Sequence, residues 1–321
     1  MRFWPPKLRL VIGSLVVACI LVVVARQFYP WTHHDPSLDR TIPEYTRPAL
    51  GAGTQALRVI AFGDSGTAGR GQRRVAEAML AKAQVDGLDL VLMLGDNFYP
   101  NGVASVDDPQ WESKIVKPYE RLNAPIYPCL GNHDHKGNPD AQVERSKLDP
   151  KWRMGGRQYT FERVLADGTR IQFFALDTDP ISKGVEVVTP QLEWLDAQLR
   201  ASTAHWKVAF GHHPIHSRGR GDNKRMRRDI EPILVKHDVD MYLCGHDHSL
   251  QVLKPRNGVN YIISGGGGGT DNPHKVDWTE DTLFAATLGG FVWLRFTRND
   301  VVVEIVRTDH QTQFGTVFAK S

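Results

Sequence analysis

This sequence contains few cysteines and has only a small net charge. Three cysteines occur in 321 residues, without the regular spacing that would indicate a disulfide framework. The net charge is +3, and no basic stripe interleaved with aromatic residues is present, so the sequence does not indicate a nucleic-acid-binding protein. One basic cluster, Arg218–Arg228, could attract an anionic substrate, although such a cluster is more typical of a solvated loop and helix face. The composition is otherwise that of a globular protein with a sizeable core.

The glycine run Gly265–Gly269 bears on a possible phosphate-binding loop, and two of the cysteines bear on a possible disulfide. No lysine–serine pair follows the glycine run Gly265–Gly269, so it does not predict a phosphate-binding loop; it would instead let the backbone pass close to a site. Cys129 and Cys244 each end an apolar run, where a small buried hydrophobic residue fits. A disulfide between these two cysteines stays open, because an oxidising compartment would permit it.

The first 27 residues are typical of a membrane-directing segment. Basic residues in Met1–Arg9 precede the uncharged run Leu10–Ala25, a pattern that leaves the N-terminus inside and exports the rest of the chain. Cleavage as a signal peptide and retention as a signal anchor both stay open. We therefore expect an exported, periplasmic or otherwise extracytoplasmic protein that meets the membrane only through this segment. Residues 28–55 contain four prolines and predict an extended linker, and residues 56–321 predict one domain.

Strand and helix patterns alternate along this domain. The predicted strands outside hairpins are Leu57–Phe62, Leu88–Leu94, Ile126–Leu130, Trp206–Phe210, Val239–Cys244 and Val259–Ser264. The predicted helices are Arg73–Ala83, Ile115–Leu122, Pro190–Ala201 and Met226–His237. Two hairpins are predicted, Gln158–Arg163 with Arg170–Leu176 and Phe291–Phe296 with Val301–Thr308, and Lys136–Gly156 is predicted to be irregular. Strand–helix units combined with hairpins indicate an α/β fold, a four-layer α/β/β/α sandwich of two mixed sheets flanked by helices.

Five of the predicted strands end in a glycine followed by residues that bind metals. Such dipeptides are common in turns, so one alone would indicate only a loop. Five in one chain, at the carboxyl ends of strands where loops gather, favour a shared metal site. The residues are Asp64, Asp96 with Asn97 and Tyr99, Asn132 with His133, His212, and His246 with His248.

This pattern resembles the calcineurin-like metallophosphoesterases. The matching motifs are Gly63-Asp64, Gly95-Asp96, Gly131-Asn132-His133, Gly211-His212 and Gly245-His246-Asp247-His248. Tyr99 makes the sequence most similar to the small, tartrate-resistant type of purple acid phosphatase. The resemblance implies that Asp64, Tyr99 and His248 bind one ion, that Asn132, His212 and His246 bind the other, and that Asp96 bridges them. The first set is rich in anionic oxygens and favours Fe³⁺, while the second suits Fe²⁺, Zn²⁺ or Mn²⁺.

The resemblance also implies a reaction. A metal-bound hydroxide would attack phosphorus in line with the leaving alkoxide, without a protein nucleophile. His133 would help to protonate the leaving group, and His135, His213 and His216 are candidates for substrate contact. His213 stands where mammalian relatives have tyrosine. A second catalytic histidine of those relatives has no aligned partner; we expect His216 to take its place, and His213 is a further catalytic candidate.

We therefore predict an exported, dinuclear-metal acid phosphatase that hydrolyses small phosphate monoesters, acting as a monomer. One alternative is a phosphodiesterase on the same fold, of the cyclic-nucleotide or phospholipid type. An alternative from another class is a non-catalytic envelope protein that binds metal or phosphate. The complete set of candidate ligands argues against this last alternative.

Overall fold

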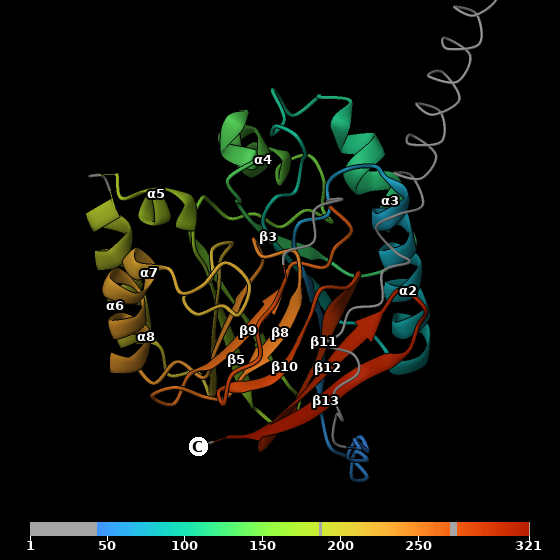
Figure 1. Ribbon diagram of the computed structural model, residues 1–321, viewed down its shortest axis with the longest axis vertical. Helices are drawn as coiled ribbons and strands as arrows, with labels where there is room; N and C mark the ends of the chain where they lie inside the picture. The colour runs from blue at the N-terminus through green and yellow to red at the C-terminus, as the bar shows by residue number, and fades with distance from the viewer. Residues whose placement is uncertain (1–43, 186–187, 270–274, 321) are drawn as a thin grey trace, which may run out of the picture.

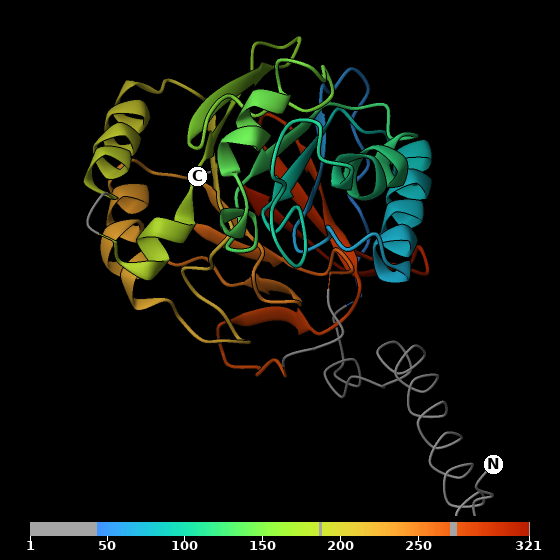
Figure 2. The ribbon, with the colours of Figure 1, turned by 90° about the horizontal axis from the view of Figure 1, so that it is seen from above.

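The computed structural model describes residues 44–185, 188–269 and 275–320. Two β-sheets lie in the centre of the molecule, with helix α2 (Arg70–Asp86) at one side and helices α5–α8, which fall within residues 178–236, at the other (Figures 1 and 2). This arrangement confirms the predicted α/β fold of two mixed sheets flanked by helices.

The first sheet combines a parallel and an antiparallel half. In spatial order its strands are β13 (Thr312–Ala319), β12 (Asp300–Arg307), β11 (Gly290–Phe296), β1 (Leu57–Phe62), β2 (Leu90–Leu94) and β3 (Ile126–Cys129). β1, β2 and β3 are parallel, and the other pairs are antiparallel. β2 is buried along its whole length because both faces of the sheet are covered, which explains its uninterrupted apolar sequence.

The second sheet is built in the same way. In spatial order its strands are β10 (Thr282–Ala286), β8 (Leu250–Leu253), β9 (Asn260–Ser264), β7 (Met241–Cys244), β6 (Trp206–Phe210), β5 (Arg170–Ala175) and β4 (Tyr159–Val164). β5, β6, β7 and β9 are parallel. β4 and β5 form the predicted antiparallel hairpin, and Gly168 in its turn has a positive φ of 82°.

The helices differ from the prediction at several places: a helix at Thr178–Lys183 was not predicted, and the helix predicted at Ile115–Leu122 is a π-helical turn, Glu112–Val116, followed by a short α-helix. Besides α2, the helices are α3 (Lys117–Tyr119), α4 (Pro139–Arg145), α5 (Thr178–Lys183), α6 (Thr189–Ala201), α7 (Lys224–Asp229) and α8 (Glu231–Lys236). The single helix predicted at Met226–His237 is two helices, because Pro232 lies in the first turn of α8 and cannot continue α7. The segment predicted as irregular contains α4, which Asn138 caps through its side chain.

Two hydrophobic clusters hold the layers together. The larger one fills the space between the sheets and draws on both, with Phe62 and Val292 from the first and Phe173 and Phe210 from the second. The smaller one lies between the second sheet and its helices. Cys129 and Cys244 are buried free thiols, one in each cluster. Burial raises the pKa of both thiols well above the ordinary value, as expected for small buried residues.

Part of the range predicted as a linker contacts the domain. The Arg47 guanidinium donates to Oε1 and Oε2 of Glu304 on β12 at 2.6 and 2.7 Å and pairs with Asp86 of α2. The hydroxyl of Tyr45 donates to Glu304 at 3.1 Å. Lys82 pairs with both carboxylates, at 2.6 Å to Glu304 and 2.8 Å to Asp86. These contacts join the chain before β1 to both the first sheet and its covering helix.

The predicted membrane-directing segment lies outside the described residues. Within the described ranges, no helix has the length and apolar character needed to cross a membrane.

Candidate metal centre

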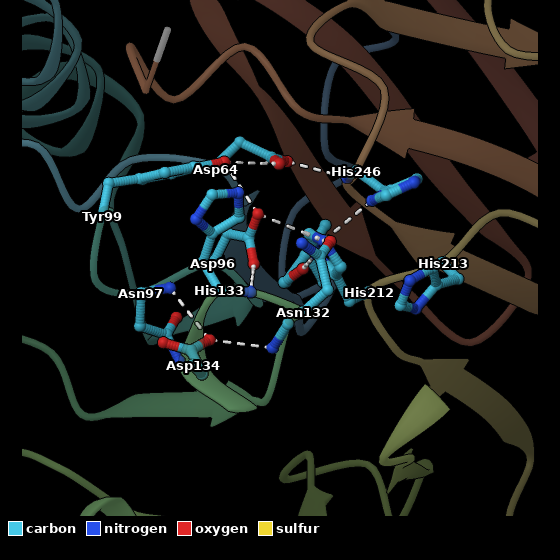
Figure 3. Close-up of polar contacts among 12 residues, drawn as sticks. Asp64, Asp96, Asn97, Tyr99, Asn132, His133, Asp134, His212, His213 and His246 are labelled. Atoms are coloured by element: carbon cyan, nitrogen blue, oxygen red, sulfur yellow. Dashed lines mark hydrogen bonds and ion pairs between the residues drawn. The ribbon is translucent and has the colours of Figure 1, made fainter. Parts of the chain in front are cut away.

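The predicted ligands follow the carboxyl ends of five parallel strands from the two sheets and converge on one site (Figure 3). Asp64 follows β1, Asp96 and Tyr99 follow β2, Asn132 follows β3, His212 follows β6, and His246 and His248 follow β7. Three of them, Asp64, Asp96 and His246, have positive φ angles of 59°, 51° and 68°. Side chains other than glycine rarely adopt this conformation, so its use at three ligand positions indicates a site where side-chain direction matters.

The first group of donor atoms surrounds the Tyr99 hydroxyl. This hydroxyl lies 2.8 Å from Oδ2 of Asp96 and 3.1 Å from Oδ1 of Asp64. Nε2 of His248 lies 3.2 Å from the Tyr99 hydroxyl and 3.2 Å from Oδ1 of Asp64. Burial raises the pKa of Tyr99, and the two carboxylates raise it further. The phenol therefore keeps its proton unless a cation replaces that proton.

The second group of donor atoms surrounds Nε2 of His212. This nitrogen lies 3.2 Å from Oδ1 of Asn132 and 3.2 Å from Nδ1 of His246. The other ring nitrogen, Nδ1, lies 2.9 Å from the carbonyl oxygen of Leu94. Because a carbonyl can only accept, Nδ1 carries the proton, and Nε2 is the atom directed at the other donors.

Asp96 joins the two groups. Its Oδ2 atom lies 2.8 Å from the Tyr99 hydroxyl and 3.5 Å from Nε2 of His212, while its Oδ1 accepts the backbone N–H of His133 at 2.8 Å. Burial would raise the pKa of Asp96, but the neighbouring His212 outweighs burial and lowers it. Burial would likewise lower the pKa of His212, and Asp96 instead raises it to about 10. Each group therefore stabilises the charged form of the other, and a metal ion would take the place of the proton on Nε2 of His212.

The chemistry of these donors fits a pair of metal ions. Ligand atoms of Asp64, Asp96 and His212, and of His212, His213 and His246, lie within 4.8 Å of one another in each set. Asp64 and Asp96 are 0% and 2% exposed, and the side chains that form ion pairs with them are histidines. Buried carboxylates are costly unless a cation compensates them. The first group offers mainly oxygen and the second mainly imidazole nitrogen, so the two positions suit different ions.

Glycines leave room for the carboxylates. A Cβ at Gly131 would lie 2.3 Å from Oδ1 of Asp96, and one at Gly245 would lie 2.5 Å from Oδ2 of Asp64. A Cβ at Gly265, the start of the glycine run, would lie 2.9 Å from the same Asp64 oxygen. The run therefore brings backbone close to the site, as predicted.

Asp134 supports two ligand loops at once, and sequence reasoning missed it. Its side chain is fully buried. Oδ2 accepts the backbone N–H groups of Asn97 and Gly131 at 3.1 and 2.8 Å. Oδ1 accepts hydrogen bonds from the backbone N–H of Phe98 at 3.2 Å and from Nε2 of Gln142 at 2.9 Å. Burial and the charge on Asp96 raise the pKa of Asp134 to about 7. The only available signal was its place directly after Asn132-His133.

Two of the four predicted catalytic or substrate-contacting histidines follow Asn132. The His133 ring packs against Tyr99 with a centroid distance of 4.4 Å, and its Nδ1 donates to the carbonyl of Pro100 at 2.6 Å. Nε2 of His135 lies 2.8 Å from Oδ1 of Asp177. Burial alone would lower the pKa of His135, but Asp177 outweighs burial and raises it.

The other two histidines lie in different surroundings. The ring of His213 packs beside those of His212 and His246, at centroid distances of 5.0 and 4.5 Å. Its Nδ1 lies 3.0 Å from Oγ1 of Thr178, a second supporting residue that the sequence did not reveal. His216 instead pairs through Nδ1 with Asp222 at 3.0 Å and through Nε2 with Glu231 at 2.7 Å. Both of its ring nitrogens are thus engaged away from the seven candidate ligands.

Comparisons with known proteins agree with this geometry. Residues 57–250 match the family model of the calcineurin-like phosphoesterases. Tartrate-resistant acid phosphatase type 5 of Homo sapiens is 31% identical over 84% of this chain and 93% of its own length. Purple acid phosphatase 17 of Arabidopsis thaliana is 30% identical over 87% of both chains.

Solved structures show the same fold. GAP50, described as the anchor in the inner membrane complex of Plasmodium, has a TM-score of 0.75 at 22% identity, over 83% of this chain and 90% of its own. Purple acid phosphatase PPD1 from yellow lupin has a TM-score of 0.65 at 19% identity, over 84% of this chain and 55% of its own.

The chain therefore belongs to the calcineurin-like phosphoesterases, among the relatives of tartrate-resistant and purple acid phosphatases. It is a metal-dependent phosphoric monoester hydrolase of that type, as the motifs predicted. Purple acid phosphatases use a dinuclear metal centre, which agrees with the two groups of donor atoms described above.

Proposed function

We propose that this chain is an exported acid phosphatase that hydrolyses small phosphate monoesters at a centre of Fe³⁺ and a divalent ion. The observation that carries the proposal is the position of Asp96, whose Oδ2 atom lies within 3.5 Å of donor atoms in both groups. One carboxylate oxygen between an oxygen-rich and an imidazole-rich group is what a bridging ligand requires.

The donor set supports a specific assignment of ions. Asp64, Tyr99 and His248 would hold Fe³⁺, since a phenolate and carboxylates favour a hard trivalent ion. Asn132, His212 and His246 would hold Fe²⁺, Zn²⁺ or Mn²⁺. The bound ions would lower the pKa of a water molecule and shield the charge of the phosphate.

The chain's own residues orient the reacting groups. The backbone N–H of His133 holds Oδ1 of Asp96, so that Oδ2 faces the two donor groups. Nδ1 of His133 donates to Pro100, so the ring would give a proton to the leaving alkoxide from Nε2 in its doubly protonated, imidazolium form. His213 lies beside His246 and provides a second imidazole at the site. His135 lies on the same loop as His133 and would contact the leaving group.

Export and the oligomeric state form the remaining part of the proposal. The basic start and the uncharged run Leu10–Ala25 support translocation into the periplasm or another extracytoplasmic space, with the membrane reached only through this segment. A monomer acting on a small phosphorylated substrate needs no further partner. Fractionation of cells that produce the full chain would test this, and recovery in the cytoplasm would contradict it.

Two competing functions give different experimental results. A phosphodiesterase would hydrolyse a bis-aryl phosphate faster than an aryl phosphate, whereas a monoesterase shows the reverse order. A non-catalytic envelope protein that binds metal or phosphate would hydrolyse neither ester. A structural neighbour is described as an anchor, so fold alone does not separate these functions. The complete set of ligand side chains supports the enzyme.

The decisive experiment combines metal analysis with both esters on the purified protein from Glu44 onward, so that the Arg47 contacts are retained. We expect iron plus a divalent ion, and activity on the aryl phosphate that is highest at mildly acid pH. A protein with two divalent ions and full activity would contradict the iron assignment. Absence of activity on both esters in the metal-loaded protein would contradict the enzyme.

A further inference from the structure

A loop docks onto the turn that carries two candidate ligands. Asp247 lies between His246 and His248 and is fully buried. Its Oδ2 accepts a hydrogen bond from Oγ of Ser217 and, at 3.0 Å, the backbone N–H of Arg220. These two bonds hold the loop from Ser217 to Arg220 against the metal-binding turn.

The side chain of Arg220 makes a third contact with the same carboxylate. Its Nε lies 3.2 Å from Oδ1 of Asp247, yet the side chain is 41% exposed. Among the described residues, neither terminal nitrogen of this guanidinium forms a hydrogen bond. The guanidinium is therefore anchored at one end and available at the other, beside the turn that carries His246 and His248.

Neighbouring arginines of the basic cluster are engaged elsewhere. Arg218 lies 3.4 Å from Asp222, Arg225 donates to the carbonyl of Ser182 at 3.2 Å, and Arg228 pairs with Asp229 at 2.6 Å. Arg220 thus differs from these three in resting on the turn that holds the metal ligands.

We propose that Arg220 binds a phosphate oxygen of the substrate and gives the site its preference for monoesters over diesters. This inference rests on the proposed function. A monoester carries up to two negative charges on three terminal oxygens, whereas a diester carries one charge on two. Two metal ions can engage two oxygens, so the third oxygen and the second charge need another donor. A guanidinium held by Asp247 supplies two N–H groups in a fixed direction.

If Arg220 served only to hold its loop against Asp247, its side chain would not be needed. Ser217 and the backbone N–H of Arg220 already hold Asp247, so the loop keeps two of its bonds when the guanidinium is removed. The test therefore compares Arg220→Gln and Arg220→Lys in the metal-loaded protein. Arg228→Gln serves as the matched control, because Arg228 is exposed and pairs with Asp229 on α7.

Three quantities are measured for each variant: metal content, the dissociation constant of inorganic phosphate, and kcat/KM on an aryl phosphate and on a bis-aryl phosphate. Arg220→Gln should keep its metal, bind phosphate about 10- to 100-fold more weakly, and lose a similar factor on the monoester with little change on the diester. Arg220→Lys should recover part of the loss, since lysine keeps the positive charge but lacks the paired N–H donors of the guanidinium. Arg228→Gln should behave as the wild type.

Equal losses on both esters, or unchanged phosphate binding, would overturn the role of Arg220. Failure of this inference can be distinguished from failure of the proposed function. If the wild type hydrolyses neither ester, the phosphatase proposal fails, while the phosphate measurements on the variants still decide whether Arg220 binds the anion.

Discussion

The Tyr99 hydroxyl lies 2.8 Å from Oδ2 of Asp96, in the turn that follows β2. The two side chains are three residues apart, and the positive φ of 51° at Asp96 turns its carboxylate back toward the phenol. An aromatic oxygen and the candidate bridging oxygen therefore belong to one turn, which would supply two ligands to the proposed Fe³⁺ position.

Replacing Tyr99 by phenylalanine tests the iron assignment. We expect the wild type to show the visible absorption of an Fe³⁺–tyrosinate pair and Tyr99→Phe to lose it, because the variant has no phenolate. The measurement is an absorption spectrum with iron analysis of both proteins. Tyr127→Phe is a suitable control, since Tyr127 is also buried but contacts Arg163 and Phe161. A spectrum of Tyr99→Phe identical to that of the wild type would rule out Tyr99 as the iron ligand.

Asp96→Asn tests the bridge. The amide carries no charge and cannot compensate two cations, so we expect phosphatase activity to fall by about 10³-fold or more and bound metal to decrease. Activity on an aryl phosphate and metal content are the measurements. Asp140→Asn controls for the substitution itself, because Asp140 is exposed and pairs with Arg157. Intact activity in Asp96→Asn would overturn the assignment of the whole site.

Asp134→Asn should destabilise the protein even though Asp134 is not a ligand. Two of the four donors around its carboxylate would face an amide nitrogen instead of an acceptor. Each buried donor left unsatisfied costs about 1–3 kcal/mol, so we expect the free energy of unfolding to fall by about 2–5 kcal/mol. Urea unfolding measures it. Unchanged stability would show that the loops do not depend on this carboxylate.

Acid should weaken the contact between Arg47, which precedes β1, and Glu304 on β12. Burial alone would raise the pKa of Glu304, but hydrogen bonds from Arg47 and Lys82 outweigh burial and lower it below 4.5. A carboxylate with a lowered pKa stabilises the fold fully above the unfolded value and loses that effect as pH falls through the folded value. The stability difference between the wild type and Glu304→Gln should therefore narrow below pH 4.5. Unfolding curves at several pH values, in one metal state, would show it; a constant difference would contradict it.

Local patterns made much of the architecture predictable. β2 and β7 are continuous apolar runs because they are buried on both faces, and each is followed by a glycine that permits a tight turn. β8, β10 and β13 were not predicted, since strands at or near sheet edges are short or carry polar residues at places that a central strand would fill with apolar ones. Their pairing depends on neighbours far away in the chain.

By itself, the sequence determined which strand ends carry candidate ligands, because a glycine followed by a carboxylate, amide or imidazole is a local feature. Only the tertiary structure decided what supports them. Asp134 joins the loops after β2 and β3, and Thr178 supports His212 and His213 from the first turn of α5. It also decided that His216 pairs with Asp222 and Glu231 and that Arg220 rests on Asp247. Such contacts connect residues through space, and sequence spacing carries little information about them.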